Sequence, residues 1–279
     1  MTNMDDFEQA TELTKTADHH YQAVLTKAWA LWGPAGGYLA ALALRAAGES
    51  TKFVRPISMT CQYFRVARLE AIDLVVSQLK QGKRSDALRV DLVQDTRLIM
   101  SAQVWAGASD TPTMEHDYVS PVTVPEPAQI PTYETVYPDR PIHPFMARIE
   151  SRPIDPIADQ DRTPRTPELS GLYRYRVREV GSSVFIDYAR AMILMDTFAW
   201  LATYPAHPGP SPWIAPNLDF YYRFHRPMLD APWLYMHTRA QLAHDSVISA
   251  DGEMRNLAGE LLVSGATSLL CSNRPEQFR

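Results

Sequence analysis

Two halves of this chain repeat the same order of elements on either side of a proline-rich stretch. Each half begins with a short strand-like segment, continues with one apolar helix and ends with several alternating strands. A similar sequence segment also recurs, because CQYFRVARLEAIDL in the first half parallels DFYYRFHRPMLDAPWL in the second. A repeat of whole supersecondary units indicates that one fold has been duplicated. We therefore expect two similar domains, a choice that the length of 279 residues alone leaves open.

The stretch between the halves is rich in proline. It contains the run VSPVTVPEPAQIPTYETVYPDRPIHPF, whose prolines fix φ and remove backbone N–H donors. Such a segment favours neither a helix nor a central strand. We expect a first domain at 1–109, a linker at 110–142 and a second domain at 143–279.

The first half contains one strongly apolar helical pattern, GPAGGYLAALALRAAG. Apolar residues recur there at helical spacing, namely Leu39, Leu42, Ala43 and Ala46. Pro34 suits a first helical turn, and Gly48 follows the last periodic residue, so the start and stop signals agree. A helix with almost no polar face is expected to be buried against a sheet.

Alternating segments predict the strands of both halves. In the first half they are TCQYFRVA, AIDLVVSQLK, DALRVDLVQD and LIMSAQVWAG. In the second half FMARIESRPI and LYRYRVREV precede the helix DYARAMILMDTFAWLATY. The strands NLDFYYRFHRP, PWLYMHTRAQL, one near 246–256 and ELLVSGATSLL follow it. The expected fold class is α+β, with antiparallel strands covering a central helix in each half.

One turn in the second half has two candidate positions. Asp251-Gly252 is a typical hairpin dipeptide, whereas matching the two halves places the turn at Ala258-Gly259. We follow the repeat and predict the second position.

Composition excludes several classes of partner. A net charge of -5 argues against broad binding to a phosphate backbone, so no nucleic acid is expected. The first residues lack a basic segment followed by an apolar one, and no apolar run approaches about 18 residues. Cys61 and Cys271 have no metal-ligand spacing around them. We expect a cytoplasmic protein with no membrane partner, no metal and no other cofactor.

Four features together resemble the acyl-CoA thioesterase II family. They are GGYLAALALRAA, a Y-F-x-x-A strand, the pair VVSQLKQGKRSDALRVDLVQD and a closing FHRP in the second half. Their order, spacing and duplication carry the likeness, which covers nearly the whole chain outside the linker. Members of that family are double hotdogs, in which each half wraps a sheet around a central helix. The resemblance implies two tandem hotdog domains and hydrolysis of an acyl-CoA thioester.

The same resemblance indicates a site in the second half. Family members activate a water with an aspartate of the second helix, a hydroxyl residue on the next strand and a glutamine on the last strand. Asp196 matches the aspartate, and its apolar neighbours in AMILMDTFAW predict burial and a raised pKa. Asn217 stands where threonine or serine is usual, and Thr267, beside Ser268, stands where glutamine is usual. Both replacements still form hydrogen bonds.

Each of these residues also has a simpler interpretation. Asp196 would be a helix-end carboxylate facing solvent, and Asn217 and Thr267 would be ordinary polar residues of strands. Backbone N–H groups of Gly36 and Gly37, at the head of the first helix, are candidates to hold the thioester carbonyl oxygen. Alternatively, these glycines only let the helix pack closely.

The predicted function is hydrolysis of an acyl-CoA thioester by a water that Asp196 activates. Met192, Met195 and Trp200 are candidates to line an acyl tunnel. The alternatives are a non-catalytic protein that binds acyl-CoA or an acyl carrier, and a hydratase or dehydratase. The hydratase needs a histidine beside the carboxylate, and the nearest downstream histidine, His207, lies in a proline-rich loop. Open sheet edges and the family's habit predict a homo-oligomer.

Overall fold

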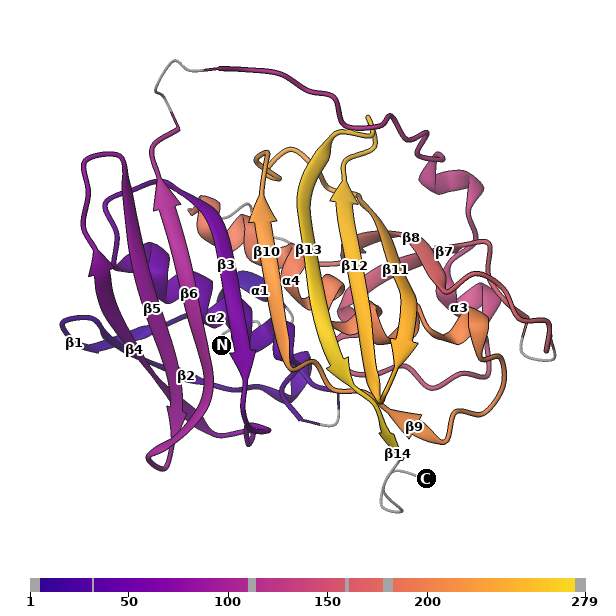
Figure 1. The fold of residues 1–279 in the computed structure, drawn as a ribbon, viewed down its shortest axis with the longest axis horizontal. Helices are drawn as coiled ribbons and strands as arrows, with labels where there is room; N and C mark the ends of the chain where they lie inside the picture. Colours follow the sequence, from indigo (N-terminus) through magenta and orange to yellow (C-terminus); the bar gives the residue numbers. More distant parts are fainter. Residues whose placement is uncertain (1–5, 32, 110–113, 159–160, 178–182, 274–279) are drawn as a thin grey trace.

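One large antiparallel sheet dominates the computed structural model, which describes residues 6–31, 33–109, 114–158, 161–177 and 183–273. Within these ranges twelve strands join in the order β1-β2-β4-β5-β6-β3-β10-β13-β12-β11-β8-β7 (Figure 1). Two further short strands, β9 and β14, pair with each other. The α+β class expected from the sequence is confirmed.

The first half contains one long helix and six strands of the large sheet. Its elements are α1 Phe7–Ala10, β1 Thr14–Ala17, β2 His20–Val24, η1 Lys27–Trp29, α2 Gly36–Glu49, β3 Arg55–Tyr63, β4 Ala71–Lys80, β5 Ser85–Gln94 and β6 Arg97–Gly107. The predicted strand AIDLVVSQLK matches β4 at both ends. Both predicted end signals of the helix were wrong, because Pro34 precedes the N-cap Ala35 and Gly48 lies inside α2, which ends at Glu49.

The second half repeats this order with a longer helix. Its elements are η3 Met146–Arg148, β7 Ile149–Ile154, β8 Glu168–Tyr175, α4 Val184–Leu201, η4 Tyr204–Ala206, β9 Trp213–Ile214, β10 Asp219–Phe224, β11 Leu234–His244, β12 Val247–Arg255, β13 Leu261–Leu270 and β14 Ser272–Asn273. Several strands begin at other residues than predicted. The largest differences are at β7, because 146–148 form a 3-10 turn, and at β8, which starts before the run LYRYRVREV. Residues 178–180 of that run lie outside the described residues.

The turn between β12 and β13 confirms the position that the repeat predicted. Gly259 has a φ of +83°, which glycine adopts without strain. Asp251 and Gly252 lie inside β12, where they pair with Ala266 and Gly265 of β13. Matching the two halves therefore predicted this turn better than the local dipeptide did.

The strand order of one half mirrors that of the other about the pair β3 and β10. These two strands run antiparallel, with Cys61 opposite Phe220 and Met59 opposite Tyr222. Because β3 and β10 belong to different halves, this pairing makes the two half-sheets one continuous surface. It also brings residues that are far apart in the sequence to the centre of the molecule.

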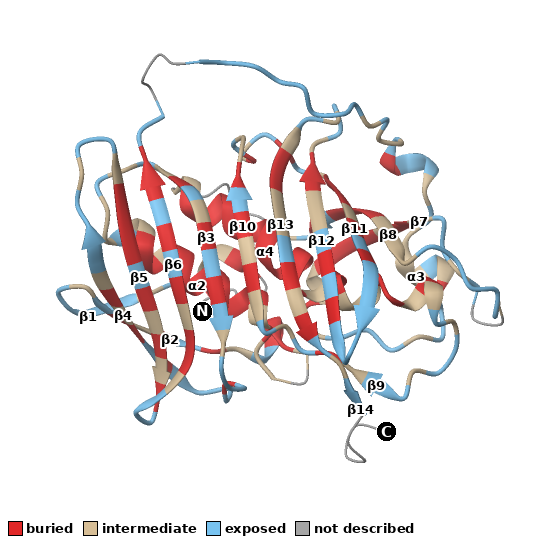
Figure 2. Ribbon diagram, in the orientation of Figure 1, coloured by how far each residue is buried: buried red, intermediate tan, exposed pale blue. Residues whose placement is uncertain are grey.

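The two long helices lie together on the inner face of the sheet. Most of their side chains are buried, while buried and more exposed residues alternate along the strands of the sheet (Figure 2). The helices contact each other, and α2 also contacts strands of its own half, as α4 does in the other half. None of the described helices is both long enough and apolar enough to cross a membrane.

The proline-rich stretch is not free of helix, so that prediction was wrong. It contains the short helices η2 Pro127–Gln129 and α3 Tyr133–Val136. In both, the residue before the helix is extended, and in η2 a proline occupies the first turn, where its missing N–H has no helical partner to lose.

The same stretch lies along the second half of the molecule (Figure 1). The Arg152 guanidinium of β7 donates to the carbonyl oxygens of Pro127 and Ile130, at 2.9 and 2.5 Å. Beyond the end of β10, Arg226 forms an ion pair with Asp117 of the same stretch at 2.7 Å. The backbone of the linker is therefore held by side chains of the second half.

Candidate active site

Asp196 is the central residue of the candidate site, and it lies in the buried part of α4. Only 5% of the residue is exposed, because the residues around it on the helix are apolar and face the core. Burial raises the pKa of Asp196 to about 6 from its ordinary 3.8. Hydrogen bonds from the Gly37 backbone N–H and the Asn217 side chain oppose this rise without cancelling it. The predicted burial and raised pKa are confirmed.

Asn217 holds the Asp196 carboxylate in place. Its Nδ2 donates to Asp196 Oδ1 at 2.6 Å and to the Asp196 backbone oxygen at 3.1 Å. Asn217 immediately precedes the start of β10, where an isolated bridge pairs it with Leu269 of β13. Both amide hydrogens of the side chain are therefore used on Asp196 itself.

Thr267 supports Asn217 from the last strand of the sheet. Its Oγ1 lies 2.6 Å from the backbone oxygen of Asp219 and 3.3 Å from Asn217 Oδ1. Strand alternation points Thr267 inward, whereas the neighbouring Ser268 is half-buried and bonds through its backbone N–H to Asp219 Oδ1. The structure thus brings together the three residues that the sequence singled out.

Gly36 and Gly37 meet the site from the first turn of α2. A Cβ on Gly36 would lie 2.8 Å from Asp196 Oδ1, and one on Gly37 would lie 2.4 Å from the Ile193 Cα. No side chain fits between the helices at these two positions. The Gly37 N–H bonds to the Asp196 carboxylate. The glycines therefore permit close packing, and the Gly37 N–H is directed at the candidate base.

Sequence reasoning missed a polar cluster beside Asp196. It consists of Cys61 and Tyr63 of β3 and Tyr222 of β10, which the pairing of the two halves brings together. The Tyr63 hydroxyl donates to the Gly36 carbonyl oxygen at 3.3 Å. Burial, with the nearby charge of Asp196, raises the pKa of all three groups above their ordinary values.

A signal for Tyr222 was present in the sequence. In the run FYYRF, alternation sends Phe220, Tyr222 and Phe224 to one face, and two of the three are phenylalanine. A single hydroxyl among inward-facing rings is unusual enough to mark the position.

The candidate acyl-tunnel residues divide into two groups. Met192 and Met195 are fully packed in the core, where the Met195 side chain approaches Gly252 and Gly265 of the sheet. Trp200 lies about one helical turn beyond Asp196. With Tyr204, Trp213 and Cys271 it lines a cavity of about 320 Å³ at the end of α4.

Among the described residues, no histidine hydrogen-bonds to the Asp196 carboxylate, as a hydratase would need. His207 follows η4 and lines the cavity, and its ring lies edge-on to Trp213, with 5.8 Å between centroids. The groups that hydrogen-bond to the Asp196 carboxylate within the described residues are an asparagine amide and a glycine N–H.

This architecture is similar to that of solved structures, one of which is described as a hotdog fold. A hot dog fold protein from Alicyclobacillus acidocaldarius is 19% identical, with a TM-score of 0.80 over 96% of this chain and 98% of its own. The acyl-CoA thioesterase II TesB2 of Mycobacterium marinum is 15% identical, with a TM-score of 0.75 over 98% and 99%. The tesB protein of Mycobacterium avium subs paratuberculosis is 20% identical, with a TM-score of 0.74 over 95% and 98%.

Family profiles match both halves of the sequence. The profile of the acyl-CoA thioesterase N-terminal domain matches residues 25–107. The profile of the acyl-CoA thioesterase C-terminal domain matches residues 121–270, a range that includes part of the proline-rich stretch. This chain belongs to the acyl-CoA thioesterase family.

Proposed function

We propose that this protein hydrolyses acyl-CoA thioesters with Asp196 as the base. The observation that carries the proposal is a buried carboxylate with a pKa of about 6, held at 2.6 Å by Asn217. A carboxylate of this kind is ionised at neutral pH and is a stronger base than an exposed one. Buried charge without a partner cation destabilises a fold, so a functional role explains why it is kept.

In the proposed reaction Asp196 accepts a proton from a water molecule as the water oxygen bonds to the thioester carbonyl carbon. The tetrahedral intermediate then breaks its carbon–sulfur bond. The proton on Asp196 passes to the departing thiolate, which leaves as CoA, and the other product is the free acid. Asn217 and Thr267 fix the carboxylate in position during these steps, because their donors are already bonded within the site.

We further propose an arrangement for the rest of the molecule. The two halves act as tandem hotdog domains, 1–109 and 143–279, joined by the linker 110–142. The chain forms a homo-oligomer, because β1 and β7 leave open edges on the sheet. Size-exclusion chromatography with light scattering tests the assembly, and a clean monomer would contradict it.

The test of the proposed function is thiol release from a panel of acyl-CoAs. The panel runs from short to long chains and includes aromatic acyl groups. We expect the wild type to turn over at least one of them and Asp196→Asn to lose that turnover. If no member releases thiol while acyl-CoA still raises the melting temperature, the protein is a non-catalytic binder of acyl-CoA or of an acyl carrier.

A further inference from the structure

One buried hydroxyl beside Asp196 has no part in the reaction described above. Tyr222 is fully buried, and its Oη makes no hydrogen bond of acceptable geometry within the described residues. The ring stacks on Phe220 at 4.2 Å and lies parallel to Phe224 at 6.4 Å, both centroid to centroid. An unpaired buried hydroxyl costs about 1–3 kcal/mol, a cost that phenylalanine at this position would avoid. The presence of tyrosine instead of phenylalanine at this position therefore indicates a role for the hydroxyl.

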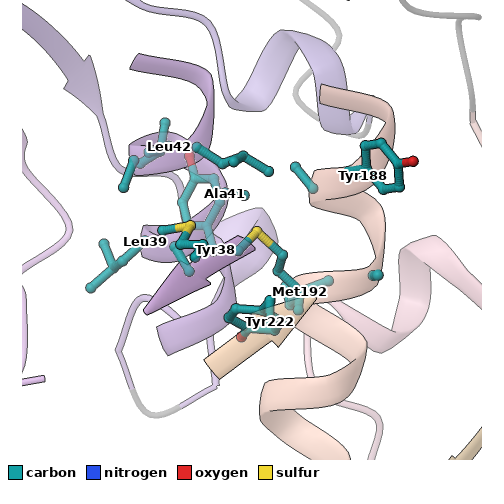
Figure 3. Packing of buried hydrophobic residues seen from close by; sticks show 14 of the residues in the cluster. Tyr38, Leu39, Ala41, Leu42, Tyr188, Met192 and Tyr222 are labelled. Atoms are coloured by element: carbon teal, nitrogen blue, oxygen red, sulfur yellow. The ribbon is translucent and has the colours of Figure 1, made fainter. Parts of the chain in front are cut away.

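The position of Tyr222 links its hydroxyl to the carboxylate. Asp196, Cys61 and Tyr63 are the polar groups that act on this hydroxyl. The Tyr63 Oη donates to the Gly36 carbonyl oxygen. Gly36 in turn lies directly against the Asp196 carboxylate, with no room for a Cβ between them. Figure 3 shows Tyr222 among the buried side chains between α2 and α4, close to Met192. Hydroxyl and carboxylate thus belong to one buried cluster.

The donors that hold the Asp196 carboxylate, and the Thr267 hydroxyl behind them, are already used. Both amide hydrogens of Asn217 bond to Asp196, and the Gly37 N–H bonds to the same carboxylate. The Thr267 hydroxyl bonds to a backbone oxygen and to Asn217. None of these groups has a hydrogen left for the carbonyl oxygen of a thioester, and Tyr222 has one.

We propose that Tyr222 is a further catalytic residue, whose hydroxyl donates to the carbonyl oxygen of the thioester that reacts at Asp196. This inference rests on the proposed function. When the water oxygen bonds to the carbonyl carbon, an electron pair moves onto the carbonyl oxygen, and the hydrogen bond from Tyr222 strengthens. When the carbon–sulfur bond breaks, the pair returns to re-form the carbonyl, and Tyr222 keeps its proton throughout.

The burial of Tyr222 agrees with this role. Asp196 is itself only 5% exposed, so a substrate that reaches the carboxylate must enter the same packing that covers Tyr222. A donor held away from water acts on a developing charge more strongly than one in bulk solvent. Burial and the charge of Asp196 raise the pKa of Tyr222 well above its ordinary value, so it stays protonated at neutral pH.

The test is Tyr222→Phe, which removes one oxygen and keeps the ring. We expect kcat to fall about 100-fold with KM little changed, as for other lost oxyanion donors. The melting temperature should be equal to or higher than that of the wild type, because no folded-state hydrogen bond is lost. Tyr221→Phe is the matched control, since Tyr221 lies on the other face of β10 beneath Arg223. It should leave kcat unchanged.

Three results would overturn the inference. An unchanged kcat in Tyr222→Phe, with Asp196→Asn inactive, would remove Tyr222 from the reaction and leave the proposed function standing. A lower melting temperature with a matching loss of activity would give the hydroxyl a structural role. A wild type that releases no thiol from any acyl-CoA would remove the proposed function and the inference together.

Discussion

The two long helices place different chemistry at the same point of their crossing. Asp196 is the thirteenth residue of α4, and Gly48 is the thirteenth residue of α2. The first turn of α2 meets Asp196 with Gly36, which leaves room for the carboxylate. The first turn of α4 meets Gly48 with Phe185, whose Cγ would lie 2.7 Å from a Cβ on that glycine. The contact between Gly36 and Asp196 encloses a polar group, whereas the equivalent contact between Gly48 and Phe185 is filled by an aromatic ring.

The duplicated halves therefore contribute different parts of the proposed site. A buried carboxylate costs stability, so keeping it in one half only limits that cost. The first half contributes the glycines that admit the carboxylate and the strand β3 that carries Tyr63. The second half contributes the carboxylate and the residues that fix it. The proposed site therefore needs both halves although only one of them carries the base.

The largest effect on activity is expected from Asp196→Asn, which removes the charge that distinguishes the contact at Gly36 from the one at Gly48. We expect kcat/KM to fall about 10²- to 10⁴-fold, because a general base is lost. Asp251→Asn, which changes an exposed carboxylate bonded to Arg239, is the control and should keep full activity. An active Asp196→Asn would mean that the two helices do not differ in chemistry.

The same variant is expected to be more stable than the wild type at pH 8. The pKa of Asp196 is raised from 3.8 to about 6 in the folded state, so the folded protein favours the neutral form. The stabilising contribution of protonated Asp196 is thus fully present below pH 3.8, and it is lost as the pH rises through about 6. At pH 8 the free energy of unfolding of Asp196→Asn should be higher by about 3 kcal/mol. Urea unfolding at several pH values measures this, and a less stable variant would contradict it.

The variants Gly37→Ala and Gly48→Ala compare how tightly the two contacts between α2 and α4 are packed. In Gly37→Ala the new Cβ would meet the backbone of Ile193 at 2.4 Å, so the helices must separate. We expect a loss of about 3 kcal/mol in unfolding free energy, and low activity, because the Gly37 N–H moves away from Asp196. In Gly48→Ala the new Cβ meets Cγ and Cβ of Phe185 at 2.7 and 3.0 Å. The gain in helix propensity offsets part of this clash, so we expect a smaller loss, of about 1–2 kcal/mol. Equal losses in the two variants would show that the crossings do not differ.

A smaller effect is expected from Asn217→Ala. Its hydrogen bond lowers the pKa of Asp196, so removing the amide should raise that pKa above the wild-type value of about 6. The acid limb of the pH–rate profile should move to higher pH, and kcat should fall about tenfold at neutral pH because the carboxylate is less well held. Asn256→Ala, in the turn before β13, is the control. An unmoved acid limb would mean that Asn217 does not act on Asp196.

Local patterns predicted the elements of the molecule and its candidate base. The spacing of apolar residues gave α2, and a lone carboxylate in AMILMDTFAW gave Asp196. Both the helix and the candidate base were predicted from residues within a few helical turns of each other. The repeat added longer-range information, since it placed the β12–β13 turn at Gly259 against the local signal of Asp251-Gly252.

The remainder of the site depends on which distant strands become neighbours. Tyr63 and Tyr222 meet because β3 of the first half pairs with β10 of the second, a register that no local pattern fixes. In the same way, the direction of the Gly37 N–H follows from the crossing of two helices far apart in the sequence. The contacts that hold the linker to the second half, such as Arg152 with Pro127, are also non-local.

The most direct test of the account is the pH dependence of kcat/KM for the wild type on its best acyl-CoA. This quantity reports the ionisation of the free enzyme. Tyr63, Tyr222 and Cys61, which face Asp196 from β3 and β10, have raised pKa values and stay protonated near neutral pH. The account therefore predicts one acid limb, with kcat/KM rising through a pKa of about 6 to a plateau. A profile that is flat from about pH 5 to 8 would contradict Asp196 as the base.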